Sequence, residues 1–299
     1  ASASAKLAAS VAHVYGRRFV GAESFTARWE DGRWQNHPGK LKALGDLIWC
    51  QGVNRFIFHR YAHQPWLNVA PGMTMGPWGF HFERTVTWWE QGAAWLRYVA
   101  RSQWMLQEGL HVADVLAWSG ETAPATGSAP ADLPPGYDWD AADTETVLAR
   151  LRVERGDLVA PHGSRWRVLV LPRQPVMTLA TARRLVELVD AGARICGPVP
   201  ERSPSLGDGP NADTELRRLV ATRWSDAPPD PTQRKIWTRP LPEVLSVYSI
   251  EPDVTFASET AGPSPRLKWI HRRHEGADWY LISNQTKQRT VVETSFRVR

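Results

Sequence analysis

RRFVGAESFT (17–26) and NRFIFHRYAHQPW (54–66) are the two stretches of sequence that decide the fold. Each is a short apolar run that ends abruptly in polar side chains able to carry out chemistry. The first run delivers the carboxylate of Glu23, and the second delivers the cluster His59–Gln64. The segment between them, 38–50, begins with proline and carries apolar residues at helical spacing. Strand, helix and strand, with functional groups where both strands end, predict an α/β barrel active site.

The rest of the first hundred residues fits this pattern. Residues 6–15 carry an apolar stripe of helical period. Residues 60–82 contain three prolines and three glycines and predict a long irregular loop, a kind that is usually functional. Residues 85–106 are rich in aromatic side chains and predict a helix. We therefore interpret 1–108 as the C-terminal portion of a (β/α)8 catalytic barrel.

The composition changes after Gly109, where strand and helix patterns alternate. Strands are expected at 111–118, 166–171 and 193–196, and helices at 142–151 and at 178–192, the second with Thr178 as its N-cap. This alternation predicts a doubly wound α/β domain over 109–224, similar to flavodoxin or amidotransferase domains. Residues 225–242 are rich in proline and predict a linker. Alternating runs after Lys268 predict the start of a β-sandwich over 243–299. The sequence reads as a fragment, because it begins without Met and ends in the middle of a predicted sheet.

Bulk composition excludes several classes of protein. The net charge of +5 comes from scattered side chains, with no run of five basic residues, so a nucleic-acid partner is not expected. No apolar run reaches the length of a membrane span. Cys50 and Cys196 are far apart in apolar surroundings and predict neither a disulfide framework nor a metal site. The 16 Trp favour aromatic platforms for sugar rings or bases, with core packing as the alternative.

Glu23 is the leading catalytic candidate. A glutamate where a barrel strand ends can serve as general acid, general base or nucleophile, and sugar hydrolysis requires carboxylates in pairs. The alternative is an ordinary surface or salt-bridged glutamate.

The cluster after the second strand suits sugar binding. His59 and His63 have the spacing of a helical metal pair, but their segment leaves a strand and no third ligand is evident, so zinc is not favoured. Hydrogen bonds to vicinal hydroxyls are the simpler use of these histidines, of Tyr61 and of Gln64. Trp78 and Trp88 are candidate stacking walls, with packing as the alternative.

Two further motifs have both a possible chemical role and an ordinary structural one. Asp138 and Asp140 in GYDWD could bind a cation, but a turn is the expected role. Cys196 follows a strand, as an amidotransferase nucleophile would. Gly197 and Pro198 do not lead into a helix, so we expect no such chemistry there.

Four long motifs carry a family resemblance: GAESFT (21–26), GVNRFIFHRYAHQP (52–65), PGMTMGPWGFHFERTVTWW (71–89) and LQEGLHVADVLAWSGE (106–121). They resemble the α-L-rhamnosidases of glycoside hydrolase family 106. The resemblance continues through PPGYDWDAADTE, WRVLVLP and DWYLISNQT, and so covers nearly the whole chain in order. It implies a barrel enzyme with a following α/β domain and β-sandwich modules. It also implies removal of terminal α-L-rhamnose from plant polysaccharides or glycosides with inversion.

The resemblance further implies roles for particular residues. Glu23 matches the motif glutamate and is expected to be the general base. His59, His63 and Gln64 match the cluster where a strand ends, and Trp78 and Trp88 match an aromatic wall. A calcium ion at the sugar site is implied by the resemblance alone, and secretion or a periplasmic location follows only from the substrate class.

The second catalytic carboxylate is expected on an earlier barrel strand, in the remainder of a longer chain, so the fragment alone is expected to be inactive. Glu83 and Glu90 have nothing in their setting to recommend them as the acid. A β-galactosidase-like barrel glycosidase and a non-catalytic carbohydrate-binding homologue remain as alternatives.

Overall fold

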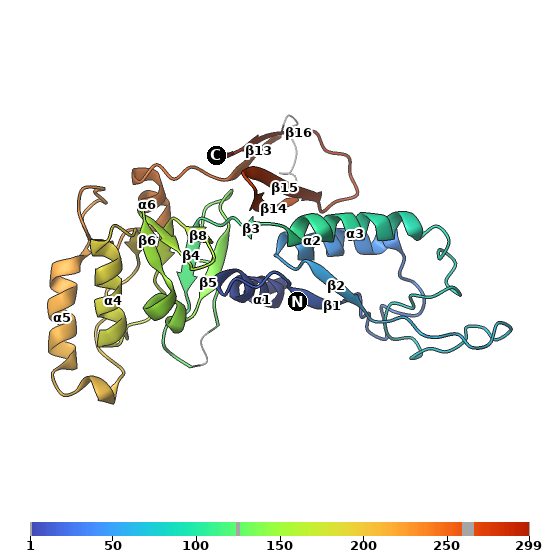
Figure 1. Cartoon of the computed structure of the whole chain (residues 1–299), viewed down its shortest axis with the longest axis horizontal. Coiled ribbons are helices and arrows are strands. Elements are labelled where there is room, and N and C mark those ends of the chain that lie inside the picture. Colours follow the sequence, from blue (N-terminus) through green and yellow to red (C-terminus); the bar gives the residue numbers. More distant parts are fainter. Residues whose placement is uncertain (1, 124–125, 259–265, 299) are drawn as a thin grey trace. The chain divides into compact units, whose positions relative to one another are not determined.

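The computed structural model describes residues 2–123, 126–258 and 266–298, and these form two compact units (Figure 1). The first unit takes its described residues from the ranges Ala1–Ala8, Arg18–Gly109 and Gly262–Thr290. The second unit takes them from Ala9–Arg17, Leu110–Ala261 and Val291–Arg299. The mixed α/β character expected from the sequence is confirmed, and each unit is described by itself below.

A parallel strand pair forms the centre of the first unit. β1 (Gly21–Ser24) pairs with β2 (Arg55–Phe58), with Glu23 opposite Ile57. The connection between them contains α2 (Pro38–Cys50), whose buried face includes Leu41 and Trp49. The predicted strand–helix–strand order is confirmed, although β1 lies three residues later than the run 18–21 suggested. The barrel itself stays a prediction, because these two strands are one βαβ step of such a fold.

Aromatic side chains fill the core of this unit. Phe80, Trp49 and Trp95 are buried, and the Phe58 and Trp95 rings stack with centroids 5.6 Å apart. The third helix, α3 (Ala93–Gln107), contributes Trp95, Val99 and Leu106 to this core. The predicted helix over 85–106 therefore begins late, since 84–92 forms turns. Six of the 16 Trp are buried somewhere in the described chain, so packing accounts for much of the tryptophan enrichment.

A β-hairpin also belongs to the first unit. β14 (Leu267–His274) and β15 (Ala277–Asn284) are antiparallel and joined by Glu275 and Gly276. Both turn residues have positive φ, at 48° and 81°, as a two-residue hairpin turn requires. The hairpin packs on α2, and buried Ser283 donates a hydrogen bond to buried Asp46 at 3.0 Å. A strand pair distant in sequence thus completes the unit.

The second unit is built on a six-stranded parallel sheet. Its strand order is β11-β12-β10-β9-β4-β5. The bounds are β4 (Val115–Trp118), β5 (Trp139–Ala142), β9 (Val168–Val170), β10 (Ile195–Cys196), β11 (Trp224–Ser225) and β12 (Ile236–Trp237). The parallel α/β sheet expected here is observed. Its near-continuous apolar strands are typical of a sheet covered on both faces.

Adjacent residues along these strands face opposite layers. Leu116, Leu169, Ile195 and Ile236 pack in one cluster, which also takes in α4 (Leu179–Asp190) and α5 (Ala212–Arg223). Val115, Val168, Cys196 and Trp237 pack in another, with α6 (Leu241–Val247). Because side chains alternate across a strand, helices cover both faces, as a doubly wound domain requires. Thr178 caps α4 by accepting from the Thr181 amide, as the sequence predicted.

One prediction for this half of the chain is wrong. Residues 225–242 are not a linker, because β12 lies inside the sheet between β10 and β11 and buries Ile236 and Trp237. The helix predicted at 142–151 is present but shorter: it follows the end of β5, covers 144–150 and has π geometry over Thr146–Arg150. Proline-rich composition hid a strand of only two residues.

The remaining elements are short or terminal. They are α1 (Ser2–Val14), β3 (Leu110–His111), the three-stranded antiparallel sheet β6 (Arg152–Glu154), β7 (Asp157–Val159) and β8 (Arg165–Trp166), a 3-10 turn (Leu206–Asp208), and the antiparallel pair β13 (Val254–Ser258) and β16 (Val292–Phe296). Strands at the predicted sandwich positions are present, but a sandwich stays a prediction. Residues 259–265 of that region lie outside the described residues. In the described chain, no helix is both long and apolar enough to cross a membrane.

Candidate active site

Glu23 lies on β1, one residue before the strand ends. Its side chain is exposed, and its Oε1 accepts a hydrogen bond from the Thr26 hydroxyl at 2.6 Å. Thr26 belongs to the same GAESFT motif, so the turn after the strand supplies the group that orients the carboxylate. The main chain continues the pairing past the strand, since the His59 amide donates to the Ser24 carbonyl at 3.3 Å. Glu23 and His59 therefore leave neighbouring strands at the same sheet edge.

A pocket of about 790 Å³ opens beside Glu23. Residues of β1, α2 and the turn after β1 line it, and its charged lining residues are Glu23, Arg28, Asp31 and Lys40. Its apolar lining includes Leu41, Leu44 and Ile48 of α2. A carboxylate at a pocket with an apolar wall and convergent charged groups has the character of a small-molecule site. The sequence interpretation missed Arg28, Asp31 and Lys40, which follow the strand or open α2 without a motif of their own.

The long loop after β2 folds back over His59. The Phe80 amide donates to the His59 carbonyl at 2.8 Å, and a Cβ on Gly79 would lie 3.3 Å from His59 Nδ1. Gly79 also has a φ of +85°, so glycine is favoured there on two counts. His59 Nδ1 is buried and has no hydrogen-bond partner among the described residues. This histidine is held in place by backbone contacts and retains an unused ring nitrogen.

Three of the predicted sugar-binding side chains are open to solvent. Tyr61 is 61% exposed, Trp78 is 47% exposed, and His63 is also exposed. Another aromatic feature escaped the sequence interpretation: the Trp34 ring stacks on His81 with centroids 4.0 Å apart. Only the general abundance of tryptophan hinted at it. The loops after both strands therefore present aromatic and imidazole groups that a sugar could reach.

Gln64 and Trp88 make structural contacts. The Gln64 carboxamide accepts from the Met73 amide at 2.9 Å and donates to the Met73 carbonyl at 2.8 Å. Trp88 donates its Nε1–H to the Asn36 carbonyl at 3.0 Å and packs against Phe80. These contacts brace the loop and pack the core, and the sugar-binding roles of the two residues stay predictions.

The other carboxylates near this motif gain no catalytic character. Glu83 is buried, and its Oε2 accepts from the Thr85 amide at 2.7 Å while Oε1 accepts from the Thr85 hydroxyl. Both of its oxygens are thus engaged in a local turn. Glu90 is exposed. Neither residue is assigned as the acid partner of Glu23.

Cys196 is not a nucleophile of the amidotransferase kind. The residue is fully buried in the sheet of the second unit, and burial, with a smaller effect of Asp132, raises the pKa of its thiol to about 12. A thiol with that pKa carries almost no thiolate near neutrality. No helix follows it directly, since α5 begins at Ala212. This geometry agrees with the expectation that Cys196 does not lie on the sharp strand-to-helix turn that an amidotransferase nucleophile requires.

Calcium at the sugar site stays a prediction. Ca²⁺ takes six to eight oxygen ligands, largely carboxylates and carbonyls. Among the described residues, a single group of three candidate metal-binding histidine, cysteine or acidic side chains is brought together, namely His13, His111 and Asp140 of the second unit. Two of these ligands are imidazoles, which suit calcium poorly.

Comparison with known sequences places this geometry in a family. Residues 1–299 match the model of glycoside hydrolase family 106, described as alpha-L-rhamnosidase. The chain belongs to this family. Glu23 and the pocket beside it therefore lie in a chain of a glycoside hydrolase family.

Two relatives show how far the similarity extends. The rhamnosidase from Novosphingobium sp. PP1Y has a solved structure that superposes with a TM-score of 0.88 at 35% identity. The match covers 99% of this family 106 chain and 28% of that one. A protein of Formosa agariphila with the curated name "Putative beta-glucuronidase" is 37% identical over 296 residues, which is 99% of this chain and 24% of that protein. The chain thus spans about a quarter of the length of the relatives it matches.

Proposed function

We propose that this chain belongs to an inverting glycosidase that removes terminal α-L-rhamnosyl residues from polysaccharides or glycosides. The observation that carries the proposal is the placement of Glu23: a solvent-accessible carboxylate near the end of β1, oriented by Thr26 and lining a pocket, within a motif of the rhamnosidase family. The complete enzyme, by this proposal, includes further segments of the kind that its longer relatives possess.

In this mechanism Glu23 is the general base. The carboxylate accepts a proton from a water molecule, and the water oxygen attacks the anomeric carbon from the face opposite the leaving group. The glycosidic oxygen leaves with a proton from a second carboxyl group, which inverting enzymes hold roughly 6.5–9.5 Å from the first. The Thr26 hydroxyl fixes one carboxylate oxygen, so the other is left to face the water. We place the acid on a barrel strand outside the described residues.

Substrate binding is assigned to the exposed groups of the two loops. His59, His63 and Tyr61 offer donors and acceptors for vicinal hydroxyls, and Trp78 offers an aromatic face. The exposure of Tyr61, His63 and Trp78 supports this role, and His59 is partly exposed although its Nδ1 is buried. A rhamnose-containing substrate of plant origin would also place the enzyme outside the cell or in the periplasm, and this location is part of the proposal.

Hydrolysis of β-D-glucuronides is a second candidate, favoured by a specific observation. The pocket beside Glu23 contains the cationic side chains Arg28 and Lys40, which suit the carboxylate of a uronic acid better than the methyl group of rhamnose. The name of the Formosa agariphila relative points to the same substrate class. A carbohydrate-binding homologue without turnover is the non-enzymatic alternative.

The test is a comparison of two aryl glycosides. We would assay 4-nitrophenyl α-L-rhamnoside and 4-nitrophenyl β-D-glucuronide with the 299-residue chain and with a longer polypeptide that carries it. Turnover of the rhamnoside by the longer polypeptide, lost by about 10³-fold or more in Glu23→Gln, is the expected result. Glu90→Gln is the matched control, because it removes an exposed carboxylate near the same loop.

Each alternative predicts a different outcome. Full activity in Glu23→Gln would refute its role as base. Turnover of the glucuronide instead, with a KM that rises in Arg28→Ala, would select the second candidate. Calorimetric binding of L-rhamnose without any turnover in the longer polypeptide would select the non-catalytic homologue.

A further inference from the structure

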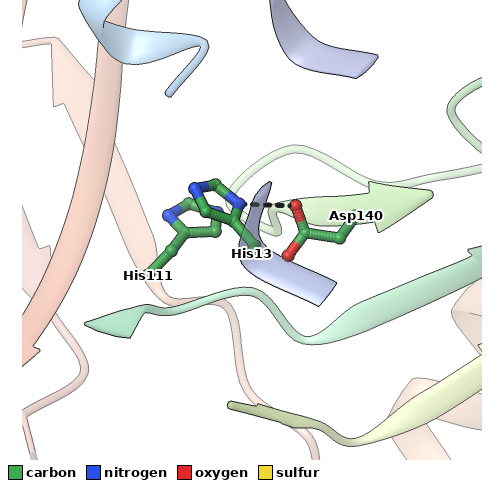
Figure 2. Close-up of side chains that lie close together, drawn as sticks. All are labelled: His13, His111 and Asp140. Atoms are coloured by element: carbon green, nitrogen blue, oxygen red, sulfur yellow. Dashed lines mark hydrogen bonds and ion pairs between the residues drawn. The ribbon is translucent and has the colours of Figure 1, made fainter. Parts of the chain in front are cut away.

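Three buried side chains of the second unit meet although they are far apart in the sequence. His13 comes from α1, His111 from β3 and Asp140 from β5 (Figure 2). Their candidate ligand atoms all lie within 4.8 Å of one another. The two imidazole rings are stacked, with centroids 4.1 Å apart and planes inclined by 22°. Polar groups brought together from three separate elements in a core call for a physical reason.

Asp140 is the centre of the group. Its Oδ1 lies 2.8 Å from His13 Nδ1, and its Oδ2 accepts a hydrogen bond from Trp166 Nε1 at 3.1 Å. The side chain is only 2% exposed. Two buried partners therefore fix the orientation of this carboxylate and leave it pointing at the imidazoles.

His111 is less well satisfied by its surroundings. Its side chain is 1% exposed, and Nδ1 has no hydrogen-bond partner among the described residues. Its Nε2 lies 3.1 Å from Asp138 Oδ2 but without the alignment of a hydrogen bond. A buried imidazole with no aligned hydrogen bond is costly unless another ligand engages it.

The residue types indicate what that ligand is. Two imidazoles, stacked 4.1 Å apart, and the carboxylate of Asp140 converge on one point in the core. Imidazole nitrogens and carboxylate oxygens together are common ligands of a divalent transition metal.

We propose that His13, His111 and Asp140, with Asp138 as the fourth ligand, form a structural site for a divalent transition metal such as Zn²⁺. Two imidazole nitrogens and carboxylate oxygens are ordinary zinc ligands, whereas calcium and magnesium prefer oxygen alone. Zinc with bonds of ~2.0–2.2 Å holds its ligand atoms roughly 3.4 Å apart, so side-chain rotations that close the 4.8 Å span of His13, His111 and Asp140, and that turn Asp138 from its contact with His111 at 3.1 Å, complete the site. On binding, the proton of His13 moves from Nδ1 to Nε2, so that the neutral ring offers Nδ1 to the metal.

The site is structural because it is closed. All four side chains are at most 15% exposed, so no coordination position faces a substrate. The metal would link the C-terminal turn of α1 to β3 and to the start of β5, and so would stabilise the second unit. In the sequence, the GYDWD motif suggested either a cation site or a turn. By this proposal it binds a cation, together with His13, which lies 127 positions before Asp140.

The experiment measures Zn²⁺ binding to the full chain after chelator treatment. We expect calorimetry to give one Zn²⁺ per chain, Co²⁺ to give the absorption of a tetrahedral site, and Zn²⁺ to raise the thermal midpoint. Asp140→Asn and His111→Gln should each weaken zinc binding by about 100-fold or more while the far-ultraviolet circular dichroism is unchanged. His111→Gln is the second variant in case Asp140→Asn does not fold.

Two controls locate the ion. His274→Gln removes a partly exposed histidine of the first unit and should leave the affinity unchanged. The double variant His59→Gln/His63→Gln removes the other histidine pair with metal-like spacing and should also leave it unchanged. The proposal is overturned if the chain binds no Zn²⁺, or if binding survives His111→Gln and is lost in that double variant.

Discussion

Replacing Asp46 by alanine should destabilise the first unit by about 2–4 kcal/mol. Asp46 is 2% exposed, and its carboxylate accepts from Tyr98 at 2.8 Å, from Ser283 at 3.0 Å and from Lys42 at 2.5 Å. The hydrogen bonds from Tyr98 and Ser283 each contribute about 1.5–3 kcal/mol, as expected for bonds to a charged acceptor. Lys42 adds at most ~1 kcal/mol, because its side chain is 53% exposed. Relief of carboxylate desolvation and the better helix propensity of alanine reduce the net loss.

The assay should report on the first unit alone. Hydrogen exchange at increasing urea concentration, read by mass spectrometry on peptides of α2 and β15, gives the free energy of opening for those elements. A loss of ~3 kcal/mol corresponds to about a hundredfold increase in the opening constant or slightly more. Asp46→Asn is the matched control, because it keeps the shape and one acceptor oxygen, and should lose roughly half as much.

A double-mutant cycle completes this test. Asp46→Ala, Ser283→Ala and the double variant should give a coupling energy of about 1 kcal/mol or more, as expected for side chains in direct contact. A loss below ~1 kcal/mol in Asp46→Ala, or no coupling to Ser283, would refute the reasoning that this carboxylate fastens the hairpin to α2.

Four further predictions concern single features. Cys50 and Cys196 are both buried, so a thiol reagent should label neither in the native chain and both in urea. Burial raises the pKa of the Cys196 thiol from 9.0 to about 12. The contribution of this thiol to stability is therefore complete below pH 9 and is lost between pH 9 and about 12. Cys196→Ala should flatten the dependence of the urea midpoint on pH across that window. Thr178→Ala removes the N-cap of α4 and should cost about 1 kcal/mol in urea unfolding, with Thr178→Ser as the control that keeps it. Gly79→Ala adds a Cβ at positive φ, 3.1 Å from the His59 carbonyl oxygen, and should lower the thermal midpoint and weaken sugar binding. Gly76→Ala is the control, because it also adds a Cβ at positive φ but in open space, and it should lower the thermal midpoint less.

Local patterns in the sequence predicted those features that depend on local physics. The parallel strands around α2 and the N-cap at Thr178 follow from hydrophobic period and end signals, and the structure contains both. The strand β12 was missed because it is two residues long in a proline-rich stretch, and only its place inside the sheet makes Ile236 and Trp237 core residues. A periodic pattern of apolar residues can be recognised only over more than one repeat, and a two-residue strand spans a single repeat.

The candidate site was predicted less completely, for a related reason. Glu23 could be singled out because it ends an apolar run, but the lining cations Arg28 and Lys40 carry no pattern that separates them from surface residues. Gln64 and Trp88 show the opposite case, because their residue types suggest a sugar site while the partners that the structure gives them are backbone groups of Met73 and Asn36. A motif does not reveal such backbone contacts.

The hydrogen bond between Asp46 and Ser283 also limits when the first unit can complete its folding. The two residues are 237 positions apart, and both belong to the first unit. During synthesis at about 5–20 residues per second, α2 leaves the ribosome roughly 12–50 s before β15 exists. Throughout that interval the face of α2 that later packs against the hairpin is uncovered, and Asp46, which is buried in the folded unit, is exposed to water. The nascent chain therefore exposes this surface while most of the second unit is being made, and chaperone binding would protect the chain most in that period.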